Sequence, residues 1–321
     1  MRRVLFVILL FAIAWPLAAQ GLKLPMKDGS VKFAVLGDTG TGSSDQVRVG
    51  KMVANYHSRF PFNFALLLGD NLYGAENPRD YERKFTIPYK PLLDAGVKFY
   101  AALGNHDDPN QRLFKAFNMN GERYYTFKPG LTSPVRFFAL DSNYMNPQQI
   151  QWLEKELAAS GSDWKIAFFH HPMYASGHHG SDEVLRAQLE PIFVKHKVNI
   201  VLTGHEHFYE RIKPQKGIQH FVVGASAKLR KGDINPTGLT AFGYDSGYSF
   251  MLAEITGDEF HYQVVTDRGQ TVDSGIVRKD SQTDRVISTT GTTGRGTVTT
   301  PSTPGVGKPA PAPAKPPARG N

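Results

Sequence analysis

Five short polar segments in this chain carry side chains that bind metal ions or move protons, and each follows a short apolar run. The segments are Gly37-Asp38-Thr39-Gly40, Gly69-Asp70-Asn71-Leu72-Tyr73, Gly104-Asn105-His106-Asp107, His170-His171-Pro172 and Gly204-His205-Glu206-His207. Each segment alone has a structural explanation, because Gly-Asp is a common turn pair and a single histidine is usually an ordinary surface or core residue. The recurrence of the pattern at one apolar run after another instead indicates a shared polar site.

The number and type of these side chains indicate two metal ions. The set holds three histidines, two aspartates, one asparagine and a tyrosine, more donors than one tetrahedral zinc ion uses. Two ions about 3.5–4 Å apart, bridged by a shared carboxylate, would use all seven. The chain contains no cysteine, so a thiolate site is excluded. Mixed oxygen and nitrogen donors suit iron, manganese or zinc.

The apolar runs predict the strands that position these residues. Strands are expected at 31–36, 64–68, 97–103, 135–140, 164–169, 198–202, 221–223, 248–255 and 259–266. Helices are expected from Ser43 or Ser44 to His57, from Pro147 to Ala159 and over 182–195. Alternating strands and helices predict an α/β fold with buried sheets, and ligands of such sheets bind beyond the carboxyl ends of the strands.

The five segments in this order resemble the signature of the calcineurin-like metallophosphoesterases. Tyr73 narrows the resemblance to the purple acid phosphatases, and Phe208-Tyr209-Glu210-Arg211 is also similar to that group. The sequence leaves no room for the N-terminal β-sandwich of the large plant enzymes, so the resemblance is to the small, tartrate-resistant type. The resemblance extends over residues 32–266. It implies an α/β fold of two mixed β-sheets packed as a sandwich and flanked by helices, with the dimetal site at the carboxyl ends of the strands.

The resemblance also assigns a role to each side chain by its position. The residues implied for an Fe(III) ion are Asp38, Asp70, Tyr73 and His207. Those implied for a divalent ion (iron, zinc or manganese) are Asp70 as the bridge, Asn105, His170 and His205. His170 is preferred over His171 because the family pattern is His-x-Pro. His106 is implied to contact the substrate phosphate, and His179 to be a catalytic histidine, with the adjacent His178 as the alternative.

The function implied is that of an acid phosphatase acting on small phosphate monoesters. Two cations would neutralise the phosphate and activate a hydroxide that attacks it, while His106 and His179 would stabilise developing charge and protonate the leaving alkoxide. Hydrolysis of a diester, a nucleotide or a phosphoprotein is an alternative, because the loops expected to select the substrate, at residues 75–83, 108–120 and 232–247, contain no pattern that indicates one substrate. A non-catalytic envelope-binding protein is a third reading, which the complete donor set argues against.

Both ends of the chain differ in composition from its middle. Arg2 and Arg3, an apolar run over 4–14 and a small-residue exit near Ala19 are typical of a secretory signal peptide, expected at 1–19. The catalytic domain is expected at 28–275. Residues 281–321 are rich in Thr, Gly, Pro and Ala and predict a disordered tail. Export without cysteine favours a bacterial periplasmic or secreted protein, with no stable membrane insertion once the signal is removed.

The net charge of +8 does not indicate nucleic-acid binding. Arg2 and Arg3 contribute +2 and residues 280–321 contribute +3, which leaves about +3 for the middle of the chain. A nucleic-acid surface needs clustered positive charge, and the middle holds no such cluster. We therefore expect a small phosphate ester as the partner; the sequence gives no indication of oligomeric state.

Overall fold

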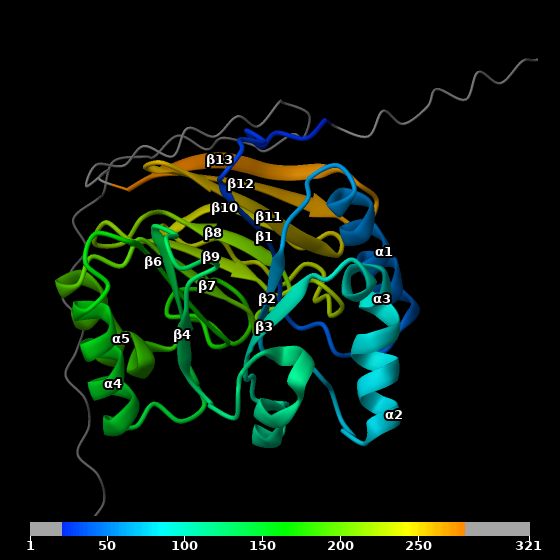
Figure 1. The fold of residues 1–321 in the computed structure, drawn as a ribbon, viewed down its shortest axis with the longest axis horizontal. Helices are drawn as coiled ribbons and strands as arrows, with labels where there is room; N and C mark the ends of the chain where they lie inside the picture. Colours follow the sequence, from blue (N-terminus) through cyan, green and yellow to red (C-terminus); the bar gives the residue numbers. More distant parts are fainter. Residues whose placement is uncertain (1–20, 280–321) are drawn as a thin grey trace, which may run out of the picture. The chain divides into compact units, whose positions relative to one another are not determined.

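A computed structural model describes residues 21–279 of the chain. The predicted signal peptide (1–19) and tail (281–321) lie outside the described residues. Two mixed β-sheets pack face to face with helices on their outer sides (Figure 1), so the predicted fold class is confirmed.

The first sheet has six strands in the order β13-β12-β11-β1-β2-β3. They are β1 (Val31–Leu36), β2 (Phe64–Leu68), β3 (Lys98–Ala102), β11 (Ser249–Thr256), β12 (Glu259–Thr266) and β13 (Thr271–Arg278). The strands β1, β2 and β3 run parallel, whereas β11, β12 and β13 form antiparallel pairs, and β11 joins the edge of β1. The three parallel strands therefore end along one edge of this sheet.

The second sheet has seven strands in the order β10-β8-β9-β7-β6-β5-β4. They are β4 (Tyr125–Phe127), β5 (Val135–Ala139), β6 (Trp164–Phe169), β7 (Ile200–Thr203), β8 (Tyr209–Ile212), β9 (Gln219–Val223) and β10 (Thr240–Tyr244). Its central strands β5, β6, β7 and β9 are parallel, and antiparallel strands border them on both sides.

Side-chain caps fix the start of the predicted helices. The α-helices are α1 (Ser44–His57), α2 (Pro78–Tyr81), α3 (Ile87–Asp94), α4 (Pro147–Ala158) and α5 (Glu183–Lys195). A π-helical turn (Glu82–Thr86) and two 3-10 turns (Pro109–Leu113 and Lys115–Phe117) complete the helical segments. The side chains of Ser43, Asn146 and Asp182 accept hydrogen bonds from the first turns of α1, α4 and α5. The three predicted helices are confirmed.

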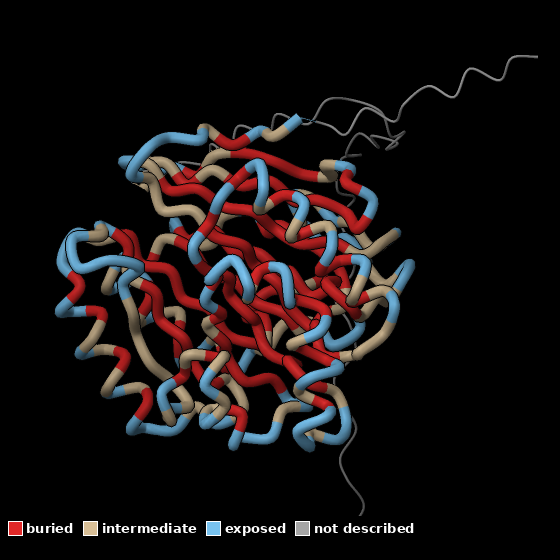
Figure 2. Tube along the Cα trace, turned by 45° about the vertical axis from the view of Figure 1, so that its right-hand side comes forward, coloured by how far each residue is buried: buried red, intermediate tan, exposed pale blue. Residues whose placement is uncertain are grey.

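Strand alternation divides the apolar side chains into three layers. Phe33 and Val35 of β1 face the second sheet and pack in the central core with Phe137 and Ile166. Ala34 and Leu36 face the other way, into the layer between the first sheet and helices α1 and α3. A third layer lies between the second sheet and helices α4 and α5. Figure 2 shows the result, with buried strands and exposed connecting loops.

Four strands were not predicted from the sequence: β4, β8, β10 and β13. β13 ends at Arg278, beyond the predicted domain boundary at 275. The loop expected at 75–83 holds α2, and the loop expected at 232–247 holds β10. None of the helices within residues 21–279 has the length and apolarity needed to cross a bilayer.

Candidate dimetal site

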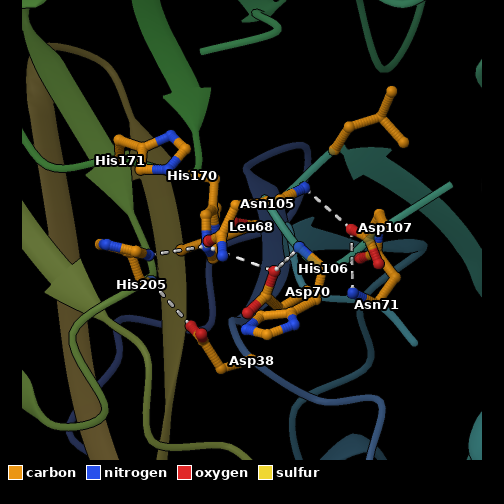
Figure 3. Close-up of polar contacts among 12 residues, drawn as sticks. Asp38, Leu68, Asp70, Asn71, Asn105, His106, Asp107, His170, His171 and His205 are labelled. Carbon is orange, nitrogen blue, oxygen red and sulfur yellow. Dashed lines mark hydrogen bonds and ion pairs between the residues drawn. The ribbon is translucent and has the colours of Figure 1, made fainter. Parts of the chain in front are cut away.

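The predicted metal donors meet where parallel strands of the two sheets end. Asp38, Asp70 and Asn105 follow β1, β2 and β3 of the first sheet. His170 follows β6 of the second sheet, and His205 and His207 follow β7. In Figure 3, His170 lies between His205 and the carboxylate of Asp70. Each sheet therefore contributes about half of the site.

Unusual backbone geometry aims several of these side chains. Asp38, Asp70 and His205 have left-handed φ angles of 56°, 50° and 69°. Such angles are costly for residues other than glycine and concentrate at functional sites. The neighbouring glycines permit close approach: a Cβ on Gly104 would lie 2.2 Å from Oδ1 of Asp70, and one on Gly204 would lie 2.6 Å from Oδ2 of Asp38. Glycine is therefore required before Asn105 and before His205, because a larger residue would collide with the carboxylate of Asp70 or Asp38.

The first donor cluster is centred on Nε2 of His170. Nδ1 of this ring lies 2.9 Å from the carbonyl oxygen of Leu68, which only accepts, so Nδ1 carries the proton of the neutral ring. The bare Nε2 then faces Oδ1 of Asn105 at 3.0 Å, Nδ1 of His205 at 3.1 Å and Oδ1 of Asp70 at 3.4 Å. Lone pairs that converge in this way fit a bound cation.

The second donor cluster joins Asp38, Asp70, Tyr73 and His207. The Tyr73 hydroxyl donates to Oδ1 of Asp38 at 3.0 Å and lies 3.4 Å from Nε2 of His207, which is itself 3.4 Å from the same carboxylate oxygen. Asp38 and Asp70 are buried, and among the described residues neither is paired with Lys or Arg. Buried carboxylates without a cationic partner are costly, so this cluster also calls for a cation.

Burial sets the protonation of these donors. Desolvation raises the pKa of Asp38, and a neighbouring Asp70 carboxylate adds to this. Desolvation, with a smaller contribution from neighbouring histidines, lowers the pKa of His205 to about 2. Desolvation, with a smaller contribution from Arg230 and Lys228, lowers the pKa of His207 to about 4. Neutral imidazole is the form that binds a metal ion, so both rings are ready to act as ligands near neutral pH.

His170 and His171 both lie in this region but differ in their contacts. Their ring nitrogens form one compact group with those of His205. His170 contacts the oxygen donors Asn105 and Asp70, whereas Nδ1 of His171 lies 2.8 Å from the Ser142 hydroxyl. This geometry is consistent with His170 as the ligand and with His171 as its neighbour at the side of the site.

The two predicted catalytic histidines border the donor clusters. The exposed His106 ring lies 4.9 Å from the Tyr73 ring, and its backbone N–H donates to Asp70 at 3.0 Å. The His179 ring lies 4.2 Å from the His205 ring, while the His178 ring contacts the His179 ring at 5.2 Å. Of the alternative pair, His179 is therefore the residue at the site.

Three supporting residues were not singled out from the sequence. The Asp107 carboxylate accepts backbone hydrogen bonds from Asn71, Leu72 and Gly104 and so ties two donor loops together. The buried Glu206 accepts the Gly180 N–H at 2.7 Å, next to His179. Nη2 of Arg230 lies 3.3 Å from Nε2 of His179. Asp107 and Glu206 could have been noticed in the sequence, because they are acidic residues inside two of the five segments.

Comparison with known proteins identifies similar chains. The family model of the calcineurin-like phosphoesterases matches residues 31–209. Purple acid phosphatase 17 of Arabidopsis thaliana is 30% identical over 71% of this chain and 79% of its own length. Human tartrate-resistant acid phosphatase type 5 is 25% identical over 80% of this chain and 94% of its own. In fold, the chain is similar to purple acid phosphatase PPD1 of yellow lupin, with a TM-score of 0.65 and 19% identity over 79% of this chain and 55% of that one.

Proposed function

The chain belongs to the calcineurin-like phosphoesterase family, and on that premise we propose that it is an exported acid phosphatase for small phosphate monoesters. The family implies a dinuclear metal site, and the donors present fit one. The observation that carries the proposal is the meeting of two donor clusters at Asp70, which belongs to the second cluster and lies 3.4 Å from His170 of the first.

We assign the ions by the chemistry of each donor set. Asp38, Asp70, Tyr73 and His207 would hold Fe(III), because three anionic oxygen donors suit a hard trivalent cation. Asp70, Asn105, His170 and His205 would hold a divalent iron, zinc or manganese ion. When bound, the two metal ions would lower the pKa of a water molecule and neutralise charge on the phosphate.

The chain's own residues then bind the phosphate and provide a proton. His106 lies beside Asn105 with its imidazole exposed, so it is placed to hold phosphate oxygens. The His179 ring lies 4.2 Å from the His205 ring, close enough to the donors of the divalent ion to protonate a leaving alkoxide there. Burial lowers the pKa of His179, and the charge of Arg230 lowers it further. Because a lowered pKa leaves this ring protonated only in acidic solution, proton donation by His179 favours acid pH.

Export is proposed on the sequence of residues 1–19 alone. A periplasmic or secreted location follows from a cleaved signal peptide, and no other segment of the sequence is long and apolar enough to cross a membrane. Determining the N-terminal residue of the mature protein after expression in a bacterial host tests this: a start near residue 20 supports export, and retained Met1 contradicts it.

The activity is tested with protein purified aerobically in the presence of iron. We expect two metal ions per chain, a pink to purple colour from Tyr73 phenolate-to-iron charge transfer, and faster hydrolysis of monoesters than of diesters. Tyr73→Phe should lose the colour and keep much of the activity, since its oxygen is not needed to bind phosphate. Colourless, oxidised, iron-replete wild-type protein would contradict the Fe(III) assignment, and preferential diester hydrolysis would contradict the substrate class.

A further inference from the structure

A cavity of about 470 Å³ opens beside the donors assigned to the divalent ion. Its lining includes Asn105 and His171 of the site, together with Tyr144, Arg123 and Asp182. Pockets for organic ligands usually measure about 300–1,000 Å³, so the space accommodates far more than a phosphate group. A phosphate ester held at Asn105 would have room to extend its organic part into this cavity.

Tyr144 is the only Phe, Tyr or Trp among the residues that line this cavity. Tyr144 is 60% exposed, and the guanidinium of Arg123 lies 4.4 Å from its ring centroid. Nε of Arg123 donates to the buried Asp141 at 2.6 Å, which fixes this guanidinium, whereas its Nη2 is buried and has no hydrogen-bond partner. A guanidinium held by an ion pair against a ring that remains largely exposed provides a platform for a second planar group.

The charges of the wall disfavour an acidic ligand. The charge of Arg123 is matched by Asp141, and Asp182 adds a further carboxylate to the lining. Asp182 uses its side chain to cap α5 by accepting the Leu185 N–H at 2.9 Å. The wall therefore has no unmatched positive charge to bind a second phosphate or a carboxylate.

We propose that this cavity binds the alcohol part of the substrate and selects an uncharged aromatic group, which stacks on Tyr144. This inference rests on the proposed phosphatase function and names the substrate class of the same site. Aryl alcohols and nucleosides both provide such a ring, so either source meets the chemistry of the cavity.

Binding of non-hydrolysable phosphonates to the metal-loaded protein tests the proposal directly. Phenylphosphonate and propylphosphonate share the same head group and differ in the aromatic ring. By calorimetry, the wild-type Kd for phenylphosphonate should be about three- to tenfold lower, the range expected for one aromatic contact. 4-Phosphonobenzoate, whose added carboxylate would enter the cavity that Asp182 lines, should bind more weakly than phenylphosphonate.

Two variants of Tyr144 form the matched pair. Tyr144→Leu keeps apolar bulk and removes the ring, so the ratio of the Kd for propylphosphonate to the Kd for phenylphosphonate should fall to about one. Tyr144→Phe keeps the ring and should keep the preference. An unchanged preference in Tyr144→Leu, with unchanged melting temperature, would overturn the proposal. Wild-type protein that hydrolyses no ester and binds no phosphonate would instead overturn the phosphatase function itself.

Turnover distinguishes the two sources of the ring. The measurement is kcat/KM for phenyl phosphate, uridine 5′-monophosphate and glycerol 2-phosphate in wild type and Tyr144→Leu. In Tyr144→Leu, kcat/KM for the ester whose ring binds in the cavity should fall about three- to tenfold more than kcat/KM for glycerol 2-phosphate. Equal losses for all three esters would show that Tyr144 acts without recognising a ring and would overturn the proposal.

Discussion

Replacing Glu206 by alanine should slow catalysis without removing the metal ions. The buried Glu206 carboxylate accepts the Gly180 N–H at 2.7 Å and a backbone hydrogen bond from His179, and it lies 3.8 Å from Nη1 of Arg230. It thus anchors the backbone on which His179 is carried. Leaving a buried hydrogen-bond donor without its partner costs about 1–3 kcal/mol. If one such bond no longer holds His179 in place, kcat should fall about 10- to 100-fold.

The assay measures kcat for an aryl phosphate at acid pH, together with metal content. Glu206→Gln keeps an oxygen for the Gly180 N–H and should retain more of the activity than Glu206→Ala. In a double-mutant cycle, Glu206→Ala should have little further effect once His179 is alanine, because its influence passes through that ring. Full kcat in Glu206→Ala with both metals bound would refute this reasoning, as would additive losses in the cycle.

Three further predictions concern metal binding and stability. Asp70→Ala should bind neither ion whereas His205→Ala should lose mainly the divalent one, and two retained metals per chain in Asp70→Ala would contradict the bridging role. Gly104→Ala should also reduce metal content, because the added Cβ would lie 2.2 Å from Oδ1 of Asp70. An unchanged number of metal ions per chain in a folded variant would contradict this, because it would show that the loop can move to accommodate the Cβ. Burial lowers the pKa of His220 to about 3, so below about pH 6.5 the unfolded chain binds a proton there that the folded chain does not. Its contribution to the free energy of unfolding should therefore fall by about 2 kcal/mol between pH 7 and pH 5, and urea titrations should show a smaller fall in His220→Leu.

The parts of the fold that the sequence predicts are those governed by local chemistry. Asp182 begins α5 by capping it, and Pro147 occupies the first position of α4. β10 was not predicted because its residues alternate between half-buried and exposed, and its existence depends on pairing with β8. The insertion of β1 between β2 and β11 was equally unpredictable, since no local pattern records a partner more than 200 residues away.

The candidate site divides in the same way. The donors were predicted because metal binding demands particular residue types, and strand ends bring those residues together. Arg230 was not predicted, since it reaches His179 across 51 residues of sequence and belongs to none of the five segments. Tyr144 was not predicted, because nothing in the sequence distinguishes this tyrosine from others. Its role depends on the cavity that the fold forms beside it.

The position of β1 between β2 and β11 affects how the chain folds during synthesis. Residues emerge from the ribosome in order, so β1 lacks one of its two neighbours until β11 has been made. Pairings between such distant segments form late and slowly. Asp38, carried by the end of β1, is thus held in place only near the end of folding, as are the histidines of the other sheet that must meet it. We therefore expect the metal ions to bind after synthesis, and an exported chain would then take them from the compartment in which it folds.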